Sequence, residues 1–305
     1  MIVSASYRTD IPAFYSEWFL RRLKEGFALV RNPYSAQLYR VDLRPQRVTG
    51  IVFWTRNFGP LLEHLDQLRA IGRPFVVQFT VTNYPRAIEP AVIPAETAVA
   101  QVHRLAREVH ALCPVWRYDP VLATSLTPAE FHIGNFARLA AALEGATDEV
   151  VISFAQIYDK SRRNLDAAAR KHGFEWWDPP VEWKRELAAR LAEVAHRHGM
   201  RLAICSQPDY LAPGAEEARC VDARRLARIC GEPLGAPLKG NRPGCACHES
   251  RDIGEYDTCP HGCLYCYAVR RRRVALARYR AHDPASPSLL PLAGEPPALL
   301  PLLAP

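Results

Sequence analysis

Gly50-Ile-Val-Phe-Trp54 and Phe75-Val-Val-Gln-Phe-Thr80 are two short runs of β-branched and aromatic residues, each as long as a typical strand. Residues 61–70, which lie between them, have the apolar spacing of a helix. Short β-branched runs that alternate with helical patterns are typical of βα units around a parallel sheet. The stretch from residue 50 to residue 80 therefore predicts such a unit and decides the fold class.

The same alternation continues on both sides of this stretch. Further strands are predicted at residues 2–6, 114–117, 150–154 and 201–205, and helices at residues 11–24, 95–112, 127–144, 164–172 and 183–198. Residues 28–31 and 38–42 predict a hairpin, and Thr127-Pro-Ala-Glu130 resembles a capping box. About six strand–helix units are too few for a complete eight-stranded barrel. We therefore expect an α/β fold, a partial TIM-like (β/α) barrel of about six parallel strands, with a Rossmann-like open sheet as the alternative.

Composition divides the chain into three parts. Residues 1–232 carry the βα pattern, residues 233–287 are cysteine-rich, and residues 288–305 form a tail rich in Pro, Leu and Ala. We expect a barrel, a second segment packed on it and a disordered tail. No window approaches the ~18–20 apolar residues of a membrane helix, and the N-terminus lacks the layout of a signal peptide. A cytoplasmic protein without a membrane partner is the resulting expectation.

Polar residues follow the predicted strands at their C-terminal ends, where parallel barrels build their functional sites. The candidate catalytic or binding residues there are Arg8, Asp10, Arg56, Asn57, Arg117 and Asp119. A guanidinium can bind a carboxylate or phosphate through two parallel hydrogen bonds, so the three arginines predict an anionic substrate or cofactor. The alternative is that these side chains form internal salt bridges or cap helices.

Five of the nine cysteines fall within 22 residues, at Cys245, Cys247, Cys259, Cys263 and Cys266. Such a group in a reducing compartment indicates metal binding rather than disulfides. Three interpretations remain open. Cys259, Cys263 and Cys266 could hold a [4Fe–4S] cluster with one open iron, Cys247 or Cys245 could add a fourth ligand, or four of the five thiolates could bind zinc.

The other cysteines and the neighbours of the group carry weaker predictions. Cys113, Cys220 and Cys230 are expected to be ordinary buried side chains. Cys205 lies at a strand end, and its role as a metal ligand, a redox group or a packing residue is left open. Glu249, Asp252, Tyr256 and Tyr265 are expected to support the loop and its cofactor.

The sequence Cys259-Pro-His-Gly-Cys263-Leu-Tyr-Cys266-Tyr-Ala268 resembles the cluster loop of radical S-adenosylmethionine (SAM) enzymes, in particular the spore photoproduct lyase branch. The resemblance implies a [4Fe–4S] cluster that binds SAM, a 5′-deoxyadenosyl radical, and a flavodoxin- or ferredoxin-type reductant. In that branch the loop follows the first strand, whereas here it follows the last unit. The loop could still lie at the barrel mouth if the terminal segment folds back over it.

At larger scale the chain resembles a bacterial family known only as domain of unknown function 1848. The matching pieces include Ser4-Ala-Ser-Tyr-Arg8, Val52-Phe-Trp-Thr-Arg-Asn57, Trp116-Arg-Tyr-Asp-Pro120 and the segment from Cys245 through Ala268. The expected function is an iron–sulfur enzyme of radical-SAM-like chemistry. The alternative is a nucleic-acid-binding protein with a structural cluster or zinc, which a net charge of +7 and the basic run from Arg270 to Arg273 would suit.

Overall fold

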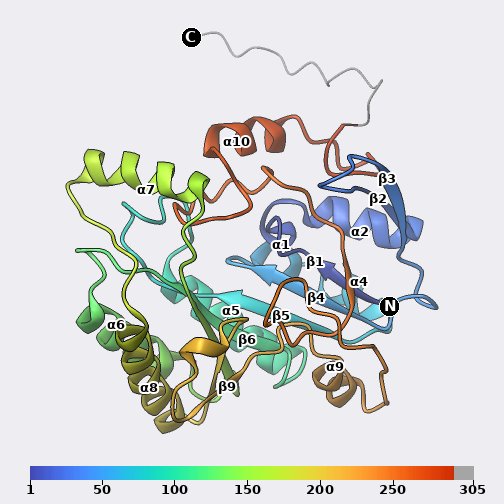
Figure 1. The fold of residues 1–305 in the computed structure, drawn as a ribbon. Coiled ribbons are helices and arrows are strands. Elements are labelled where there is room, and N and C mark those ends of the chain that lie inside the picture. Colours follow the sequence, from blue (N-terminus) through green and yellow to red (C-terminus); the bar gives the residue numbers. More distant parts are fainter. Residues whose placement is uncertain (292–305) are drawn as a thin grey trace.

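A sheet of eight parallel strands forms the centre of the computed structural model, which describes residues 1–291 (Figure 1). From one edge to the other, the strands are β10 (Ser250–Asp252), β1 (Ile2–Ala5), β4 (Gly50–Thr55), β5 (Phe75–Thr80), β6 (Pro114–Val121), β7 (Glu149–Phe154), β8 (Arg201–Ile204) and β9 (Ala215–Glu217). Every neighbouring pair is parallel. The prediction of about six strands was therefore too low, because the three-residue edge strands β9 and β10 were missed. Within residues 1–291 these edge strands do not pair with each other, so the sheet is open.

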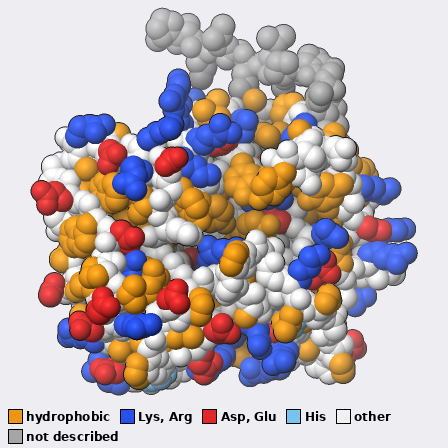
Figure 2. Space-filling model, in the orientation of Figure 1, with side chains coloured by type: hydrophobic (Ala, Val, Ile, Leu, Met, Phe, Trp, Pro, Cys, Tyr) orange, Lys and Arg blue, Asp and Glu red, His pale blue; other side chains and the backbone are white. Residues whose placement is uncertain are grey.

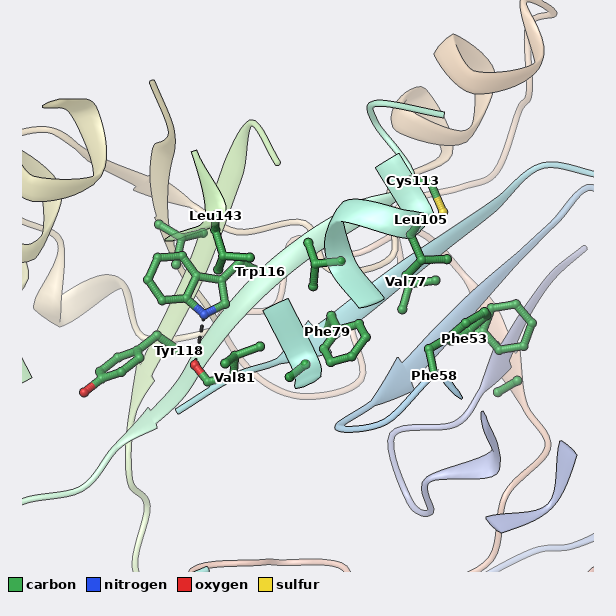
Figure 3. Close-up of a cluster of buried hydrophobic side chains, with 14 of the residues drawn as sticks. Phe53, Phe58, Val77, Phe79, Val81, Leu105, Cys113, Trp116, Tyr118 and Leu143 are labelled. Atoms are coloured by element: carbon green, nitrogen blue, oxygen red, sulfur yellow. Dashed lines mark hydrogen bonds between the residues drawn. The ribbon is translucent and has the colours of Figure 1, made fainter. Parts of the chain in front are cut away.

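The helices are α1 (Ile11–Phe14), α2 (Ser16–Glu25), α3 (Gly59–Leu62), α4 (Leu65–Ala70), α5 (Ala95–Glu108), α6 (Ala129–Leu143), α7 (Asp159–His172), α8 (Val181–Arg197), α9 (Ala223–Cys230) and α10 (Arg272–Arg280). Residues of α1 to α8 pack in the main core, whereas Ala223 and Leu226 of α9 pack in a second apolar cluster on the other face of the sheet. The main core lies between strands and helices, where Trp116 of β6 stacks on Phe136 of α6 (4.6 Å between ring centroids). Figure 3 shows the centre of this core, including the hydrogen bond from Trp116 Nε1 to the Val81 carbonyl oxygen at 3.0 Å.

Three helix predictions differ from the structure in detail. The predicted helix 11–24 is divided at Tyr15 into α1 and α2, and the predicted helix 61–70 is divided into α3 and α4. The capping box at Thr127 was wrong, since Pro128 is the N-cap of α6 and the Thr127 hydroxyl donates instead to the Leu122 carbonyl oxygen at 2.7 Å. The N-cap role of Asp10 was correct, because its Oδ1 accepts the Ala13 amide at 3.0 Å.

The other face of the sheet changes from apolar to polar along the strands, and this change determines where the site lies. Near the start of each central strand it is apolar, with Ile2, Val52, Val76, Val115, Val151 and Ala203 in one buried cluster. Side chains alternate between faces, so the residue two positions later lies on the same face. These next residues are Ser4, Trp54, Gln78, Arg117, Ser153 and Cys205. This face is therefore apolar near the N-terminal ends of the strands and has a more polar layer toward their C-terminal ends.

Segments outside the central units close over this polar layer. The hairpin β2 (Phe27–Arg31) and β3 (Leu38–Asp42) is antiparallel, as predicted, and lies near α10 and the C-terminal region (Figure 1). The cysteine-rich segment contributes β10 to the sheet edge beside β1. In the predicted disordered tail, Leu289 is buried against the core, and residues 292–305 lie outside the described part. In residues 1–291 no helix has the length and apolar character needed to cross a membrane.

Candidate functional site

A cavity of about 670 Å³ lies at the C-terminal ends of the parallel strands. The strand ends and the cysteine-rich segment both line it, and so does the hairpin through Tyr34 and Tyr39. Seven of the nine cysteines are among its lining residues: Cys205, Cys220, Cys245, Cys247, Cys259, Cys263 and Cys266. The cavity therefore joins the predicted polar strand ends to the predicted cysteine group.

Contacts to backbone carbonyl groups fix the cysteine loop to the βα units around the sheet. The Tyr15 hydroxyl donates to the Thr258 carbonyl oxygen at 2.8 Å, and the Leu264 amide donates to the Ile88 carbonyl oxygen at 3.2 Å. Gly262 has a φ of 80°, a conformation that glycine adopts without steric cost. A Cβ atom at Gly262 would lie 2.4 Å from Arg272 Cδ, so it would displace Arg272 from its hydrogen bond with the Pro260 carbonyl oxygen.

The three thiols of this loop lie in the cavity wall and are only partly exposed. Burial raises the pKa of Cys263 to about 12, and it also raises the pKa values of Cys259 and Cys266. Cys259 is close enough to the other two for their charges to raise its pKa further. Such a set of three thiols disfavours isolated thiolates and suits a cationic partner.

Arg56 and Glu89 form a buried ion pair beside Cys263. Arg56 Nη2 lies 2.8 Å from Glu89 Oε1, and the Tyr265 hydroxyl hydrogen-bonds with both side chains. Thr82 Oγ1 donates to the same carboxylate at 2.7 Å. The predicted cofactor-binding residue Tyr265 thus lies in the site, but Glu89 was missed because nothing in its local sequence distinguishes it.

Asp10 connects the first strand to the loop. Its Oδ2 is 2.8 Å from His261 Nε2 and accepts the Arg56 amide at 2.8 Å, while its Oδ1 accepts the Thr55 hydroxyl at 2.6 Å. Asn57 belongs to the same turn, but its side chain accepts the Gly59 amide at 3.0 Å and does not line the cavity. Asp10 therefore organises the site, whereas Asn57 supports the start of α3.

Arg8 and Asp252 form a second buried ion pair, with 2.9 Å between Nε and Oδ1. The hydroxyl groups of Ser4 and Ser6 both donate to this carboxylate at 2.7 Å. Tyr256, another predicted site residue, lies with its ring centroid 5.7 Å from the Arg8 guanidinium carbon. These contacts hold the cysteine-rich segment on β1.

Arg117 is paired as well. Its Nη2 lies 2.7 Å from Asp119 Oδ2, and its Nη1 donates to Gln78 Oε1 at 3.1 Å. Asp119 also accepts a hydrogen bond from Ser153. Arg8, Arg56 and Arg117 were expected to anchor an anionic ligand, but each has an internal carboxylate partner. The alternative of internal salt bridges is the arrangement found here.

A second group of thiols lies in the same cavity, away from the loop. The Sγ atoms of Cys205 and Cys220 are 3.5 Å apart, and Cys247 Sγ accepts the Val221 amide at 3.4 Å. A hydrogen bond with Cys247 lowers the pKa of Cys245 to about 5. Cys220 was expected to be an ordinary buried side chain, and no spacing in the sequence connects it to Cys205. The same prediction was wrong for Cys230, which is exposed at the end of α9.

The rim of the cavity carries further charges. The predicted residue Glu249 lies 2.9 Å from Lys239 Nζ in an exposed pair. Arg242 Nη2 is 3.5 Å from Cys205 Sγ, and in residues 1–291 this arginine has no carboxylate partner. Arg242 was not singled out from the sequence, where it is one of many loop arginines.

A single zinc ion is not supported by this arrangement. Across the described residues, no three His, Cys, Asp or Glu side chains converge as ligands of one metal ion. The zinc alternative required Cys245 and Cys247 to face Cys263 and Cys266 around one point. Instead, the first two lie with Cys220 and Val221, and the last two lie beside Arg56.

Similarity to solved structures is low. The chain shares 12% identity with a D-hydantoinase (TM-score 0.30), covering 67% of this chain and 41% of that one. It shares 10% identity with the 3-dehydroquinate dehydratase from Aquifex aeolicus VF5 (TM-score 0.32), covering 83% and 90% of the two chains. A dihydropyrimidinase from Brevibacillus agri NCHU1002 is 13% identical (TM-score 0.28), with coverage of 61% and 37%.

No curated protein matches the sequence. Residues 2–268 match a protein family, and this range includes the strand ends, the cysteine loop and every residue of the second thiol group. The chain belongs to the family described as domain of unknown function (DUF1848).

Proposed function

We propose that this protein is an iron–sulfur enzyme in which Cys259, Cys263 and Cys266 hold a [4Fe–4S] cluster. The observation that carries the proposal is that all three thiols of one loop line the cavity at the strand ends. Cysteine thiolates are the usual protein ligands of such clusters. Sites at the C-terminal ends of parallel strands are also where barrel enzymes place their chemistry.

The residues present fit this cluster. Three thiols on one loop supply ligands for three of its four irons. Cys245 and Cys247 contact a different part of the fold. One iron would thus remain open toward the cavity. When bound, the cluster supplies single electrons at low potential to a ligand on that iron. The loop sequence supports SAM as this ligand, a flavodoxin- or ferredoxin-type protein as the electron donor, and a partial (β/α) barrel as the scaffold.

The surrounding side chains would position the cluster and the substrate. Arg56 places a cation beside Cys263 that offsets part of the negative charge of the bound thiolates, and its carboxylate partner Glu89 reduces this effect. Asp10 and His261 would hold the loop against β1 and β4. Arg242 is a guanidinium available to an anionic substrate group, a role the sequence had suggested for Arg8, Arg56 and Arg117.

The first experiment is anaerobic reconstitution with iron and sulfide, followed by EPR of the dithionite-reduced protein with and without SAM. We expect about four irons per chain, and a reduced-cluster signal that changes when SAM is added. Cys263→Ser should lose the signal, whereas Cys230→Ser, an exposed cysteine outside the cavity, should keep it. A signal indifferent to SAM would exclude the SAM enzyme, and a protein that takes up zinc but no iron would exclude the cluster.

A nucleic-acid-binding protein with a structural cluster is the second candidate. Arg271, Arg273 and Arg280 are exposed on and just before α10, and in residues 1–291 they have no carboxylate partner. Figure 2 shows Lys and Arg side chains gathered on the part of the surface where α10 lies in Figure 1. Salt-dependent binding of DNA or RNA without any SAM-dependent signal would favour this candidate.

A further inference from the structure

Two thiols are in contact where β8 and β9 end at the wall of the cavity. The Sγ atoms of Cys205 and Cys220 are 3.5 Å apart, and both residues line the cavity. Cys205 follows β8 and Cys220 follows β9, so neighbouring parallel strands bring them together. The iron–sulfur proposal uses neither residue.

Cationic groups surround this pair. Arg117 Nη1 donates to Cys220 Sγ at 3.0 Å, and Arg242 Nη2 donates to Cys205 Sγ at 3.5 Å. Both thiols also border the apolar cluster on this face of the sheet, but a cysteine that only fills space there needs no cation. A guanidinium favours the thiolate, which is the reactive form of the side chain. It acts here against the hydrogen bond with Cys220 and the burial that raise the pKa of Cys205, and against the contacts and burial that raise the pKa of Cys220 to about 11.

Two further thiols connect the pair to the more accessible part of the cavity. Cys247 lies close enough to both Cys220 and Cys245 for each of them to shift its pKa. Cys245 is partly exposed, whereas the other three cysteines are buried. The four thiols therefore form a continuous series from the accessible surface of the cavity to the buried pair.

We propose that Cys205 and Cys220 are a redox-active dithiol that is oxidised by exchange with a disulfide substrate, and that Cys245 and Cys247 carry the exchange. This activity needs no iron–sulfur cluster. A single metal ion is a poor occupant of the same thiols, because no three acidic, His or Cys side chains in the described chain converge on one point. Contact between two sulfur atoms is, by contrast, what disulfide exchange requires.

The exchange balances in atoms and electrons. The Cys245 thiolate attacks the substrate R–S–S–R, forming a mixed disulfide and releasing R–S⁻, and Cys247 then displaces the second R–S⁻ to give a Cys245–Cys247 disulfide. Cys220 attacks the Cys247 sulfur and frees Cys245. Cys205 then attacks Cys220 and frees Cys247. Overall, Cys205 and Cys220 lose two electrons and two protons, and the substrate becomes two R–SH molecules.

The test equilibrates the full-length protein without air in buffers of defined glutathione to glutathione disulfide ratio. Free thiols are then alkylated, and the disulfides are mapped by mass spectrometry. We expect a Cys205–Cys220 disulfide that appears in oxidising buffers and disappears again in reducing ones. Cys205→Ser should abolish it and leave Cys220 alkylated or in a mixed disulfide, whereas Cys230→Ser should change nothing at this site.

A substitution outside the thiols tests the environment of the pair. Arg242→Gln removes a cation that favours the thiolate, so the reduced form becomes less stable relative to the disulfide. The glutathione ratio at half-oxidation should shift about threefold toward more reducing buffers. On this scale, a tenfold shift corresponds to ~30 mV in reduction potential. Lys239→Gln is the matched control, because this rim cation pairs with Glu249 instead of a thiol.

Two results would overturn the proposal. One is that both thiols stay reduced across the whole range of buffers. The other is a bound metal that is lost in Cys205→Ser and in Cys220→Ser, which would assign the thiols as ligands. Iron content and EPR of the same samples keep the two proposals apart. A reversible disulfide without a cluster would overturn only the iron–sulfur proposal, and a cluster with a permanently reduced pair would overturn only this one.

Discussion

Arg8 Nε lies 2.9 Å from Asp252 Oδ1, although 244 positions separate the two residues in the chain. Arg8 follows β1 and Asp252 ends β10, so the pair joins the first strand to the cysteine-rich segment. Both side chains are almost inaccessible, and Ser4 and Ser6 complete the hydrogen bonds of the carboxylate. The segment that bears the cysteines is thus fixed to the first strand of the sheet through a buried charge pair.

Replacing Asp252 should therefore be strongly destabilising. In Asp252→Ala the Arg8 guanidinium stays buried without its partner, and the free energy of unfolding should fall by about 3–5 kcal/mol. Urea unfolding followed by circular dichroism measures this loss. Asp42→Asn is the control, because its ion pair with Arg44 is exposed and should contribute little. Equal stability of the two variants would contradict the structural role of the buried pair.

The central strands could be predicted because each carries its own signal. The strand at residues 75–80 was predicted with the bounds that β5 has, since its β-branched and aromatic run begins directly after Gly72-Arg-Pro74 and ends in a polar threonine. The strands β9 and β10 have three residues each, and Ala215–Glu217 is not even apolar. Such short strands form because a neighbouring strand offers its backbone, which local sequence does not reveal.

The same distinction separates the predicted and the missed parts of the site. Polar residues at strand ends indicated where the cavity lies, because all parallel strands end at one edge. Their partners could not be predicted, since Glu89 reaches Arg56 and Asp252 reaches Arg8 only after the chain has folded. Cys220 is the clearest case: its thiol contacts Cys205 through the pairing of β8 with β9.

Gly262→Ala should disturb the cysteine loop. The residue has a φ of 80°, which costs a non-glycine residue about 1–2 kcal/mol, and the new Cβ would also displace Arg272. We expect lower stability and less iron per chain after reconstitution. Gly134→Ala in α6 is the matched control, since no atom lies within 4 Å of its Cβ position. It should raise helix stability by about 0.5–1 kcal/mol, and undiminished iron in Gly262→Ala would show that the turn does not shape the site.

His132 makes stability depend on pH. Burial lowers the pKa of this side chain to about 4, and an unfolded histidine has a pKa near ~6.5. The unfolded chain therefore takes up the proton first, so the contribution is complete above about pH 6.5 and is lost as the pH falls toward 4. Between pH 7 and pH 5 the loss should be about 2 kcal/mol.

Urea unfolding at several pH values tests this prediction. His132→Gln should unfold with a shallower pH dependence, because the titrating group is gone while Gln can still hydrogen-bond with Tyr118 or with the Leu122 carbonyl oxygen. His172→Gln, at the exposed end of α7, should keep the wild-type dependence. An unchanged slope in His132→Gln would place the acid sensitivity elsewhere.

The basic surface of α10 gives the sharpest test between the two candidate functions. If Arg271, Arg273 and Arg280 contact phosphates, their joint replacement by Ser should reduce the salt dependence of single-strand binding by about 0.7 per lost contact, or about 2 in all. Replacing Arg190, Arg197 and Arg228, which are exposed on α8 and α9 at the opposite end of the molecule, should leave this slope unchanged (Figure 1). Fluorescence anisotropy with a labelled oligonucleotide measures the slopes of both triple variants. The salt concentration is varied between 50 and 200 mM, roughly the range in which phosphate contacts change the affinity most clearly. Equal slopes for the two triple variants would mean that α10 is only a solvated face, and the iron–sulfur enzyme would then remain the better account of the cavity.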